Sequence, residues 1–178
     1  TAILLESGEL EHAGDEGELL IGLPNTQTML RYWNDPAKTK AALLTRHDQT
    51  WFKTGDHVVQ DEDGYLFYRG RTDDIISSSG YRIGPQEVEN ALIEHPAVRE
   101  SAVIGVPDEE RGEIVKAFII LNDPDAAGPQ LIDELQEHTK ATTAPYKYPR
   151  QIEFVSALPK TVSGKIQRQL LRKHTALK

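Results

Sequence analysis

Lys165 is the first residue whose neighbours suggest chemistry, since it follows a serine and a glycine in the stretch LPKTVSGKIQRQLL (158–171). A glycine–lysine pair ahead of a helix is typical of phosphate-binding P-loops. That pattern is excluded here. A P-loop requires a glycine where this chain has Pro159, and a hydroxyl residue where it has Ile166.

The simpler interpretation is that Ser163 and Gly164 form a turn and that Lys165 is a solvated charge in the first turn of a helix. A cation at the positive N-terminal end of a helix is unfavourable by some tenths of a kcal/mol. An anion brought in from elsewhere would remove this conflict. The residues themselves leave open which anion that is.

Two further clusters place charged residues where strands and turns meet. Asp56 follows a glycine in TGD, where it could cap a turn or accept hydrogen bonds from a ribose diol. The stretch GRTDDIISSSGYRIGPQEVE (70–89) holds more charged and loop-forming residues than a plain strand-to-helix connection needs. Its aspartates and glycines could simply form turns. Alternatively, Gly80 permits close approach of a ligand, and Arg71 and Arg82 bind phosphates.

Composition excludes several kinds of chemistry. The chain has 178 residues, of which 38% are hydrophobic and 27% are charged, as in an ordinary globular protein. Because there is no cysteine, disulfides, thiolate zinc sites and a cysteine nucleophile are excluded, and the histidines show no metal-ligand spacing. We therefore expect no metal site. No apolar run approaches the roughly 20 residues of a membrane span, and no signal-peptide pattern is present, so the cytoplasm is the default compartment.

The charge is negative overall but unevenly distributed. A net charge of −8 argues against a nucleic-acid binder, because such proteins need a basic face. From Tyr146 onward, however, lysine and arginine residues are frequent, and Glu153 is the single acidic residue. A basic end on an acidic chain indicates either a local polyanion site or a solvated cationic tail.

The elements that must position these residues change in character near 71–73. Up to this point the sequence predicts short strands at TAILLE, GELLIG, WFKTGD, HVVQ and YLFYRG. It predicts one helix over 35–44, with Asp35 as its N-cap and Pro36 at its first position. The first part is therefore expected to be β-rich.

After this boundary, strands and helices alternate. Helices are predicted over 84–96, 128–140 and 165–173. Strands are predicted at DIISS, ESAVIGV, VKAFIIL and QIEFV, and the continuous apolar runs among them are expected to be buried on both faces. The whole is an α+β pattern, in which the second part forms a compact domain with a short central sheet flanked by helices.

Taken together, WFKTGD, GRTDDIISSSGYRIGPQEVE and LPKTVSGKIQR resemble three signature motifs of the adenylate-forming (acyl-CoA synthetase) superfamily. TAPYKYPRQIEFV and HPAVRESAVIGVPDEERGEIVKAF are most similar to its medium-chain acyl-CoA synthetase branch. The resemblance covers nearly the whole chain. It implies that 1–72 form the C-terminal end of the large AMP-binding domain and that 73–178 form the mobile C-terminal lid domain.

The resemblance also implies a two-step reaction. A small-molecule carboxylate attacks the α-phosphorus of ATP with magnesium, which gives an acyl-adenylate and pyrophosphate, and the thiol of coenzyme A then displaces AMP. Lys165 would bridge the carboxylate and the α-phosphate, where an ammonium stabilises negative charge in the transition state. Asp73 would be the hinge about which the small domain swings between the two steps.

The other site residues are carried over from the family by position. Asp56 would hold the ribose hydroxyls of ATP, Arg71 the ribose or phosphates, and Arg82 a phosphate. The residues implied to bind coenzyme A are Ser79, Gly80 and Tyr81 along the pantetheine tunnel, and Arg111, Lys140, Tyr148, Pro149 and Arg150 around the nucleotide. Ser77 departs from the pattern, because several relatives carry a lysine there, although coenzyme A ligases of this branch often lack it.

Several expectations about the whole protein follow from the resemblance. The family's ATP-phosphate loop, adenine motif and acyl pocket would lie in the missing N-terminal domain, so this polypeptide alone is not expected to catalyse the full reaction. No residue of an acyl pocket is present to indicate the acyl chain length. We also hypothesise that a lysine acetyltransferase switches off adenylation by modifying Lys165, because acetylation removes the charge.

Two alternative functions stay open. An adenylate-forming ligase with a carrier-protein acceptor would share the pantetheine contacts but lack the nucleotide contacts, whereas Arg111, Lys140 and Arg150 favour free coenzyme A. A non-catalytic interaction domain of the same fold is the other alternative, and it would have no physical need for Lys165.

Overall fold

The structure is a computed structural model that describes residues 1–5, 7–11 and 16–176. The chain divides into two compact units, Thr1–Asp73 and Asp74–Lys178. Both helices and strands are present, and the α+β class predicted from the sequence is confirmed. No helix among the described residues is both long and apolar enough to cross a membrane.

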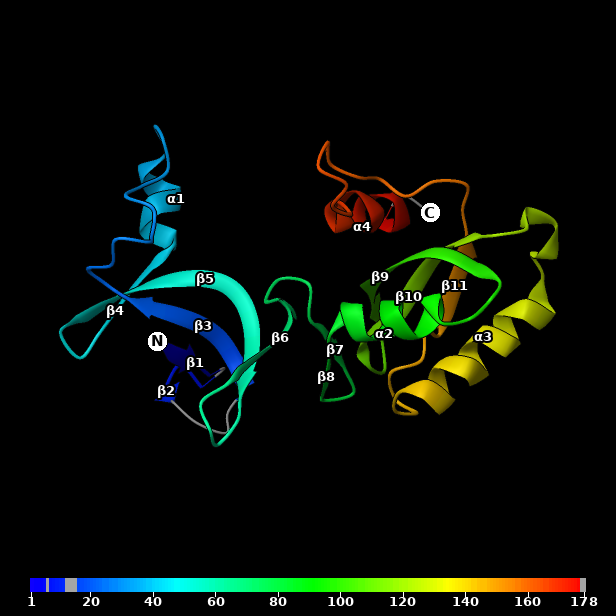
Figure 1. Ribbon diagram of the computed structural model, residues 1–178, viewed down its shortest axis with the longest axis horizontal. Coiled ribbons are helices and arrows are strands. Elements are labelled where there is room, and N and C mark those ends of the chain that lie inside the picture. Colours follow the sequence, from blue (N-terminus) through cyan, green and yellow to red (C-terminus); the bar gives the residue numbers. More distant parts are fainter. Residues whose placement is uncertain (6, 12–15, 177–178) are drawn as a thin grey trace. The chain divides into compact units, whose positions relative to one another are not determined.

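Within the described residues of the first unit, six strands form one antiparallel sheet. The strands are β1 (Ala2–Leu4), β2 (Leu10–Glu11), β3 (Glu16–Gly22), β4 (Leu43–Arg46), β5 (Gln49–Gln60) and β6 (Leu66–Arg71). The long strand β5 organises the sheet. One of its edges pairs with β3, and the other pairs with β4 near the start of β5 and with β6 near its end (Figure 1).

Few apolar side chains are buried in the first unit. Among its described residues, the buried apolar side chains are Ala2, Ile3, Leu20 and Val58. Leu30 and Trp33, by contrast, are 99% and 91% exposed. Because burial of apolar surface is the main favourable term in folding, this unit has little to stabilise it.

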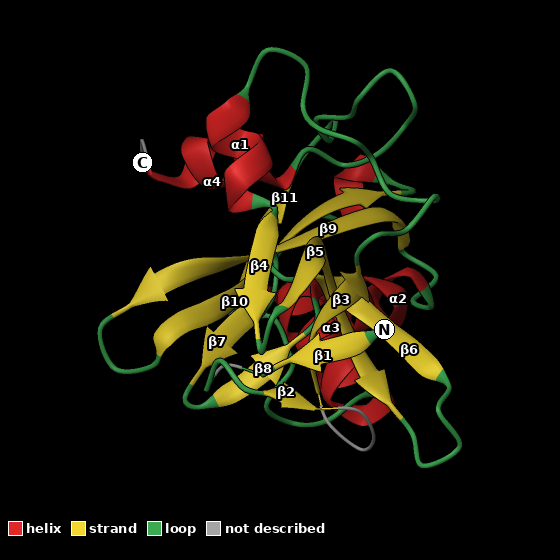
Figure 2. Ribbon diagram, turned by 90° about the vertical axis from the view of Figure 1, so that its left-hand side faces the viewer, coloured by secondary structure: helices red, strands yellow, loops and turns green. Residues whose placement is uncertain are grey.

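The predicted helix of the first unit is shorter than the sequence pattern indicates. α1 (Pro36–Ala41) begins as predicted, since Asp35 accepts a hydrogen bond from the backbone N–H of Lys38 at 2.9 Å. The prediction that the helix runs to residue 44 is wrong, because β4 begins at Leu43 and pairs with β5 (Figure 2). Pairing with a distant strand thus overrides the local helix pattern.

The second unit is built around a five-stranded mixed sheet. Its elements are β7 (Ile76–Ser78), β8 (Tyr81–Ile83), α2 (Pro85–Ile93), β9 (Val98–Asp108), β10 (Gly112–Leu121), the 3₁₀ turn η1 (Pro124–Ala126), α3 (Pro129–Thr142), β11 (Gln151–Phe154) and α4 (Arg168–Ala176). β10 lies in the centre. It pairs with β9 along one edge, and with β11 in parallel and β7 in antiparallel orientation along the other.

Alternate side chains of a strand point to opposite faces of a sheet. The apolar strands of this sheet therefore present an apolar surface on each face, and helices cover both. One core contains Val103, Val115, Ala117 and Ile119 of the sheet with Val88 and Leu92 of α2 and Leu131 and Leu135 of α3. The other contains Ala102, Ile104, Phe118 and Ile120 with Leu158 and with Leu171 of α4. Figure 1 shows α4 on one side of the sheet and α2 and α3 on the other. The predicted burial of β9 and β10 on both faces is confirmed.

One local prediction in the second unit is wrong, and another gains detail. Turns were expected around the glycines of 70–89, and at Gly80 the turn joins β7 to β8 in a hairpin whose two loop residues, Ser79 and Gly80, have φ angles of 50° and 82°. The terminal helix was expected to begin at Lys165, but α4 begins at Arg168. The preceding residues instead form a hairpin loop closed by a bridge between Lys160 and Ile166.

Candidate functional site

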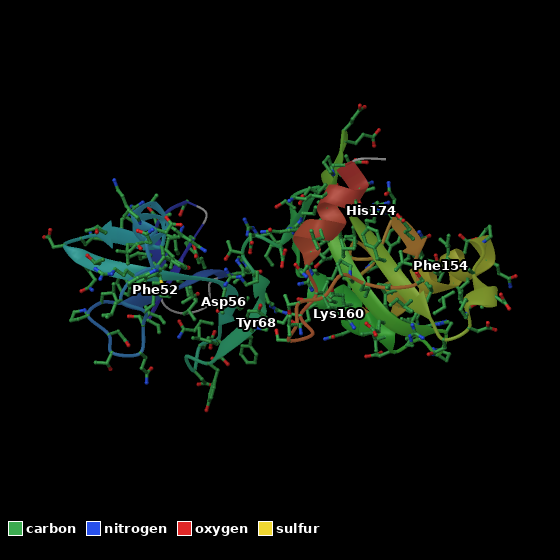
Figure 3. The ribbon with its side chains drawn as sticks, turned by 90° about the horizontal axis from the view of Figure 1, so that it is seen from above. Phe52, Asp56, Tyr68, Phe154, Lys160 and His174 are labelled. Carbon is green, nitrogen blue, oxygen red and sulfur yellow. The ribbon has the colours of Figure 1, made fainter. Side chains whose placement is uncertain are left out.

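Asp56 and Arg71 lie side by side in the first unit, as partners on the adjacent strands β5 and β6. Arg71 Nη1 donates to Asp56 Oδ1 at 3.1 Å and to the carbonyl oxygen of Thr54 at 2.8 Å. Arg71 Nε lies 3.6 Å from Asp73 Oδ1. Figure 3 labels Asp56, together with Tyr68 of the neighbouring strand β6. A carboxylate and a guanidinium are thus both partly exposed at one point of the sheet.

The charge of Arg71 is stabilised by these acids. Partial burial lowers the pKa of its guanidinium, but the hydrogen bond to Asp56 and the charges of Asp56 and Asp73 raise the pKa by more, so that it lies above the ordinary arginine value. Arg71 is therefore a permanent cation. It can bind a phosphate or a ribose oxygen without changing its protonation state.

Gly55 makes room for this guanidinium. Its φ angle is 72°, in the left-handed region that favours glycine. A Cβ atom at this position would lie 2.2 Å from Arg71 Nη2 and 2.7 Å from Arg71 Cζ. The glycine of the TGD motif is thus required both by the backbone and by the packing of Arg71 on it.

Of the residues expected along the pantetheine tunnel, Ser79 and Gly80 form the turn between β7 and β8, and Tyr81 is the first residue of β8. The positive φ angles of Ser79 and Gly80 are typical of the two-residue loops that join antiparallel strands. Apart from Gly80 and its two chain neighbours, no described residue has an atom within 4 Å of the position a Cβ would take on Gly80, so the turn presents open space. Arg111 Nη1 donates to Ser79 Oγ at 3.0 Å, and the N–H of Ser79 donates to the carbonyl of Arg111 at 2.9 Å.

Tyr81 stacks on Tyr146, which the sequence prediction missed. Their ring centroids are 4.1 Å apart and the rings are inclined by 16°. Tyr81 is 50% exposed and Tyr146 is 38% exposed, so the pair lies on the surface. Lys147, the next residue, pairs with Glu87 in the first turn of α2. The aromatic and basic run YKYPR (146–150) was the only sign of this contact in the sequence.

Lys140, Tyr148 and Arg150 form a second contact set. Lys140 Nζ lies 4.3 Å from the centroid of the Tyr148 ring, and Arg150 Cζ lies 4.7 Å from it. Arg150 Nη1 also donates to the Tyr148 hydroxyl at 2.6 Å. The hydrogen bond that Lys140 donates to Glu137 raises the pKa of the lysine above its ordinary value. The set therefore places two cationic side chains on one aromatic ring.

Pro149 and Arg82 lie in less exposed settings. Pro149 is buried, and its carbonyl accepts a hydrogen bond from Gln136 Nε2 at 3.0 Å. Arg82 lies on β8 next to Tyr81, and its strand partner is Ser77 of β7. Ser77 donates its backbone N–H to Glu113 Oε2 at 2.9 Å. The binding roles expected for Pro149 and Arg82 stay predictions.

Lys165 lies in the exposed hairpin loop that precedes α4. Its carbonyl accepts from the N–H of Thr161 at 2.8 Å, and its own N–H donates to Thr161 Oγ1 at 3.1 Å. Gly164 has a φ angle of 84°, which lets the chain turn. Within the described parts of the chain, the Lys165 ammonium has no hydrogen-bond or ion-pair partner. The loop therefore holds the lysine backbone and leaves its charge free.

The predicted nucleotide-binding residues are divided between the two units. Asp56 and Arg71 belong to the first, and Arg82 and Lys165 to the second. The residues expected to bind coenzyme A all belong to the second unit. Across residues 1–5, 7–11 and 16–176, no group of three or more His, Cys, Asp or Glu side chains is arranged to hold a metal ion.

Comparison with known proteins defines the class of this chain. Residues 87–165 match the family described as the AMP-binding enzyme C-terminal domain. Residues 87–165 therefore belong to this domain family, whose members are AMP-binding enzymes of the adenylate-forming superfamily.

The relatives within this class are acyl-CoA synthetases. The mitochondrial acyl-coenzyme A synthetase ACSM4 of Rattus norvegicus is 51% identical over 175 residues, which are 96% of this chain and 30% of the relative. The uncharacterized acyl-CoA ligase YtcI of Bacillus subtilis (strain 168) is 48% identical over 171 residues, which are 96% of this chain and 32% of the relative. The chain thus spans about a third of the length of these curated relatives.

A solved structure supports the same class. The anthranilate CoA ligase AuaEII, in complex with anthranoyl-AMP, superposes with a TM-score of 0.83 and 40% sequence identity, over 99% of this chain and 32% of that one. The resemblance to the superfamily and to its medium-chain branch, inferred from the motifs, is confirmed by these findings.

Proposed function

We propose that this chain is part of an AMP-forming acyl-CoA synthetase, an acid–thiol ligase that activates a carboxylic acid with ATP and transfers the acyl group to coenzyme A. In this proposal the first unit supplies Asp56 for the ribose hydroxyls of ATP and Arg71 for the ribose or phosphates. The second unit supplies Arg82 for phosphate and Lys165 for the adenylation step. Magnesium would enter with the ATP phosphates.

Lys165 acts by charge. Attack of the carboxylate on the α-phosphorus builds up negative charge, and an ammonium placed between the two groups stabilises that charge. The ammonium of Lys165 on an exposed loop is consistent with this role, since no acid among the described residues of its own unit pairs with it. A stand-alone interaction domain would have no need to keep such a lysine unpaired.

The observation that carries the coenzyme A assignment is the Lys140, Tyr148 and Arg150 set. Coenzyme A carries a 3′-phosphate, a diphosphate and an adenine ring, which suit cations and aromatic faces. The set presents two cations on one aromatic ring. A carrier-protein acceptor presents only a pantetheine arm, and it would leave this set without a ligand.

The test is a calorimetric titration of the 178-residue chain with coenzyme A, with 3′-dephospho-coenzyme A and with pantetheine. We expect coenzyme A to bind most tightly and pantetheine to bind most weakly. Arg150→Gln should weaken coenzyme A binding about tenfold or more, because charge-assisted hydrogen bonds contribute about 1.5–3 kcal/mol. Lys173→Ala removes an exposed cation of α4 and serves as the control. Equal binding of all three ligands would favour the carrier-protein alternative.

Regulation by acetylation belongs to the same proposal. Lys165 is exposed and its amine is free, whereas the nearby Lys160 pairs with Glu100. A lysine acetyltransferase would remove the charge from Lys165 and so block adenylation. The test is mass spectrometry after treatment with an acetyltransferase and acetyl-CoA, with both half-reactions assayed in the complete enzyme. Acetylated Lys165 with undiminished adenylation would contradict the proposal, as would labelling confined to Lys160 and Lys173.

The compartment is also part of the proposal. The sequence makes the cytoplasm the default, but the rat relative is named as mitochondrial. Fluorescence microscopy of the complete, tagged protein would distinguish the two compartments.

A further inference from the structure

Four charged side chains of the second unit form a network that neither the predicted ATP contacts nor the predicted coenzyme A contacts use. They are Asp74, Glu89, Arg168 and Arg172, here called the α4 anchor. Arg168 Nη2 donates to both carboxylate oxygens of Glu89, at 2.7 and 2.8 Å. Arg168 Nη1 lies 3.4 Å from Asp74 Oδ2, and Arg172 Nη2 donates to Asp74 Oδ1 at 2.8 Å.

Three of the four side chains of the α4 anchor are largely withdrawn from water, whereas Arg172 is 32% exposed. The side chains of Glu89, Asp74 and Arg168 are only 10%, 12% and 19% exposed. Arg168 Nε also donates to the carbonyl of Val103 on β9 at 3.2 Å, and Glu89 Oε1 accepts from the N–H of Val103 at 2.8 Å. Two acids and two bases balance each other, and screening by solvent is weak at such depth. The network therefore holds the start of α4 firmly on α2 and β9.

The hairpin loop with Lys165 has few other attachments. Residues 161–165 are exposed, and the hydrogen bonds of their backbone stay within the loop. The loop is fixed at its two ends. On one side Lys160 pairs with Glu100 of β9, and Figure 3 labels this lysine. On the other side the chain enters α4, whose first residue is Arg168.

The α4 anchor also reaches the point where the chain enters the second unit. Asp74 is the first residue of that unit and follows Asp73, the predicted hinge. Arg168 and Arg172 bind this residue from α4. The helix α4, which follows Lys165 in the chain, is thus bound directly to Asp74, the residue next to the predicted hinge.

We propose that Arg168 is a positioning residue for Lys165. Through Glu89 and Asp74 it fixes the base of the hairpin loop relative to the hinge, so that rotation of the unit carries the ammonium to one defined place. This inference rests on the proposed function, because it assumes that Lys165 takes part in adenylation. Arg168 itself touches neither substrate nor the reacting atoms in this proposal.

The test compares Arg168→Lys with Lys173→Ala in the complete enzyme, which includes the large domain. Lysine keeps the charge but cannot contact Glu89, Asp74 and Val103 together. Pyrophosphate exchange should fall about 10- to 100-fold in Arg168→Lys, because a displacement of about 1 Å of a catalytic group can cost that much. Thioester formation from supplied acyl-adenylate should stay within about twofold of the unsubstituted rate. Lys173→Ala, on the same helix, should change neither step.

A structural readout on the 178-residue chain accompanies the kinetics. Hydrogen exchange at the amides of Thr161 and Gly164 should become faster in Arg168→Lys, while the amides of β10 keep their protection. If Arg168→Lys does not fold, Asp74→Asn keeps the shape of the side chain while weakening the link to α4. It should then show the same selective loss of adenylation.

Three results would overturn the inference. They are unchanged pyrophosphate exchange in Arg168→Lys, an equal fall of both half-reactions, and unchanged exchange of the loop amides. Lys165→Ala is measured alongside. If its adenylation were undiminished, the proposed function would fail and the inference with it. If Lys165→Ala loses adenylation but Arg168→Lys does not, only the inference fails.

Discussion

Tyr81 and Tyr146 lie with their rings stacked, with centroids 4.1 Å apart and an inclination of 16°. The first follows the turn expected along the pantetheine tunnel, and the second lies two residues before Tyr148 of the predicted nucleotide contacts. The stack therefore joins the two halves of the proposed coenzyme A site. Without this stack, no contact between Tyr81 and the segment 146–150 would bring the predicted pantetheine and nucleotide contacts together.

Removing this stack should affect the thiol substrate. We expect Tyr146→Ala to raise the KM for coenzyme A in thioester formation by about 2- to 10-fold, since stacked aromatic pairs contribute about 0.5–1.5 kcal/mol. Adenylation should be unchanged. Tyr146→Phe, which keeps the ring, should behave as the unsubstituted enzyme. An equal change in Tyr146→Phe would show that the hydroxyl, and not the stack, matters.

Gly55→Ala should displace Arg71 from Asp56. The added Cβ would lie 2.2 Å from Arg71 Nη2, and the φ angle of 72° adds backbone strain. We expect a raised KM for ATP in pyrophosphate exchange, together with a loss of stability greater than the roughly 1–2 kcal/mol of left-handed strain alone. Gly64→Ala is the matched control, because Gly64 has a φ angle of 87° but nothing nearer than 3.6 Å to an added Cβ. A normal KM for ATP in Gly55→Ala would contradict the role of Arg71.

Lys165→Ala and Gly80→Leu should separate the half-reactions of the complete enzyme. Loss of the lysine should slow adenylation about 10²- to 10³-fold and leave thioester formation from supplied acyl-adenylate largely intact, because the charge acts only in the first transition state. Gly80→Leu should do the reverse, since its side chain fills open space at the turn. Gly80→Ala has the same backbone strain but a small side chain. Comparing it with Gly80→Leu therefore separates the effect of filling the space at the turn from the effect of backbone strain. Equal loss of both steps in both variants would exclude domain alternation.

The second unit should fold without the first. It has a core on each face of its sheet, whereas few apolar side chains of the first unit are buried. We expect a chain that starts at Thr72 to unfold cooperatively on heating, as followed by circular dichroism. In the 178-residue chain, backbone amides before Asp73 should exchange faster than those of β9 and β10. A gradual melt of the shorter chain would show that residues 1–71 contribute to its core.

Local patterns in the sequence determined most elements and the class of the site. The aspartate–proline start of α1, the apolar runs of β9 and β10 and the amphipathic α2 and α3 follow from capping, burial and periodicity, which act within a few residues. The motifs around Asp56, Gly80 and Lys165 identified the superfamily for the same reason. Short stretches with defined spacing carry that information.

Only the tertiary structure decided how these pieces meet. Leu43 and Leu44 form β4 and not a helix because β5 offers a pairing edge, and Lys165 lies in a hairpin loop because Lys160 and Ile166 pair across it. The Tyr81–Tyr146 stack and the binding of Arg168 to Asp74 and Glu89 join segments far apart in the chain. Such contacts depend on how the whole unit packs, and a pattern that spans only a few residues cannot predict that packing.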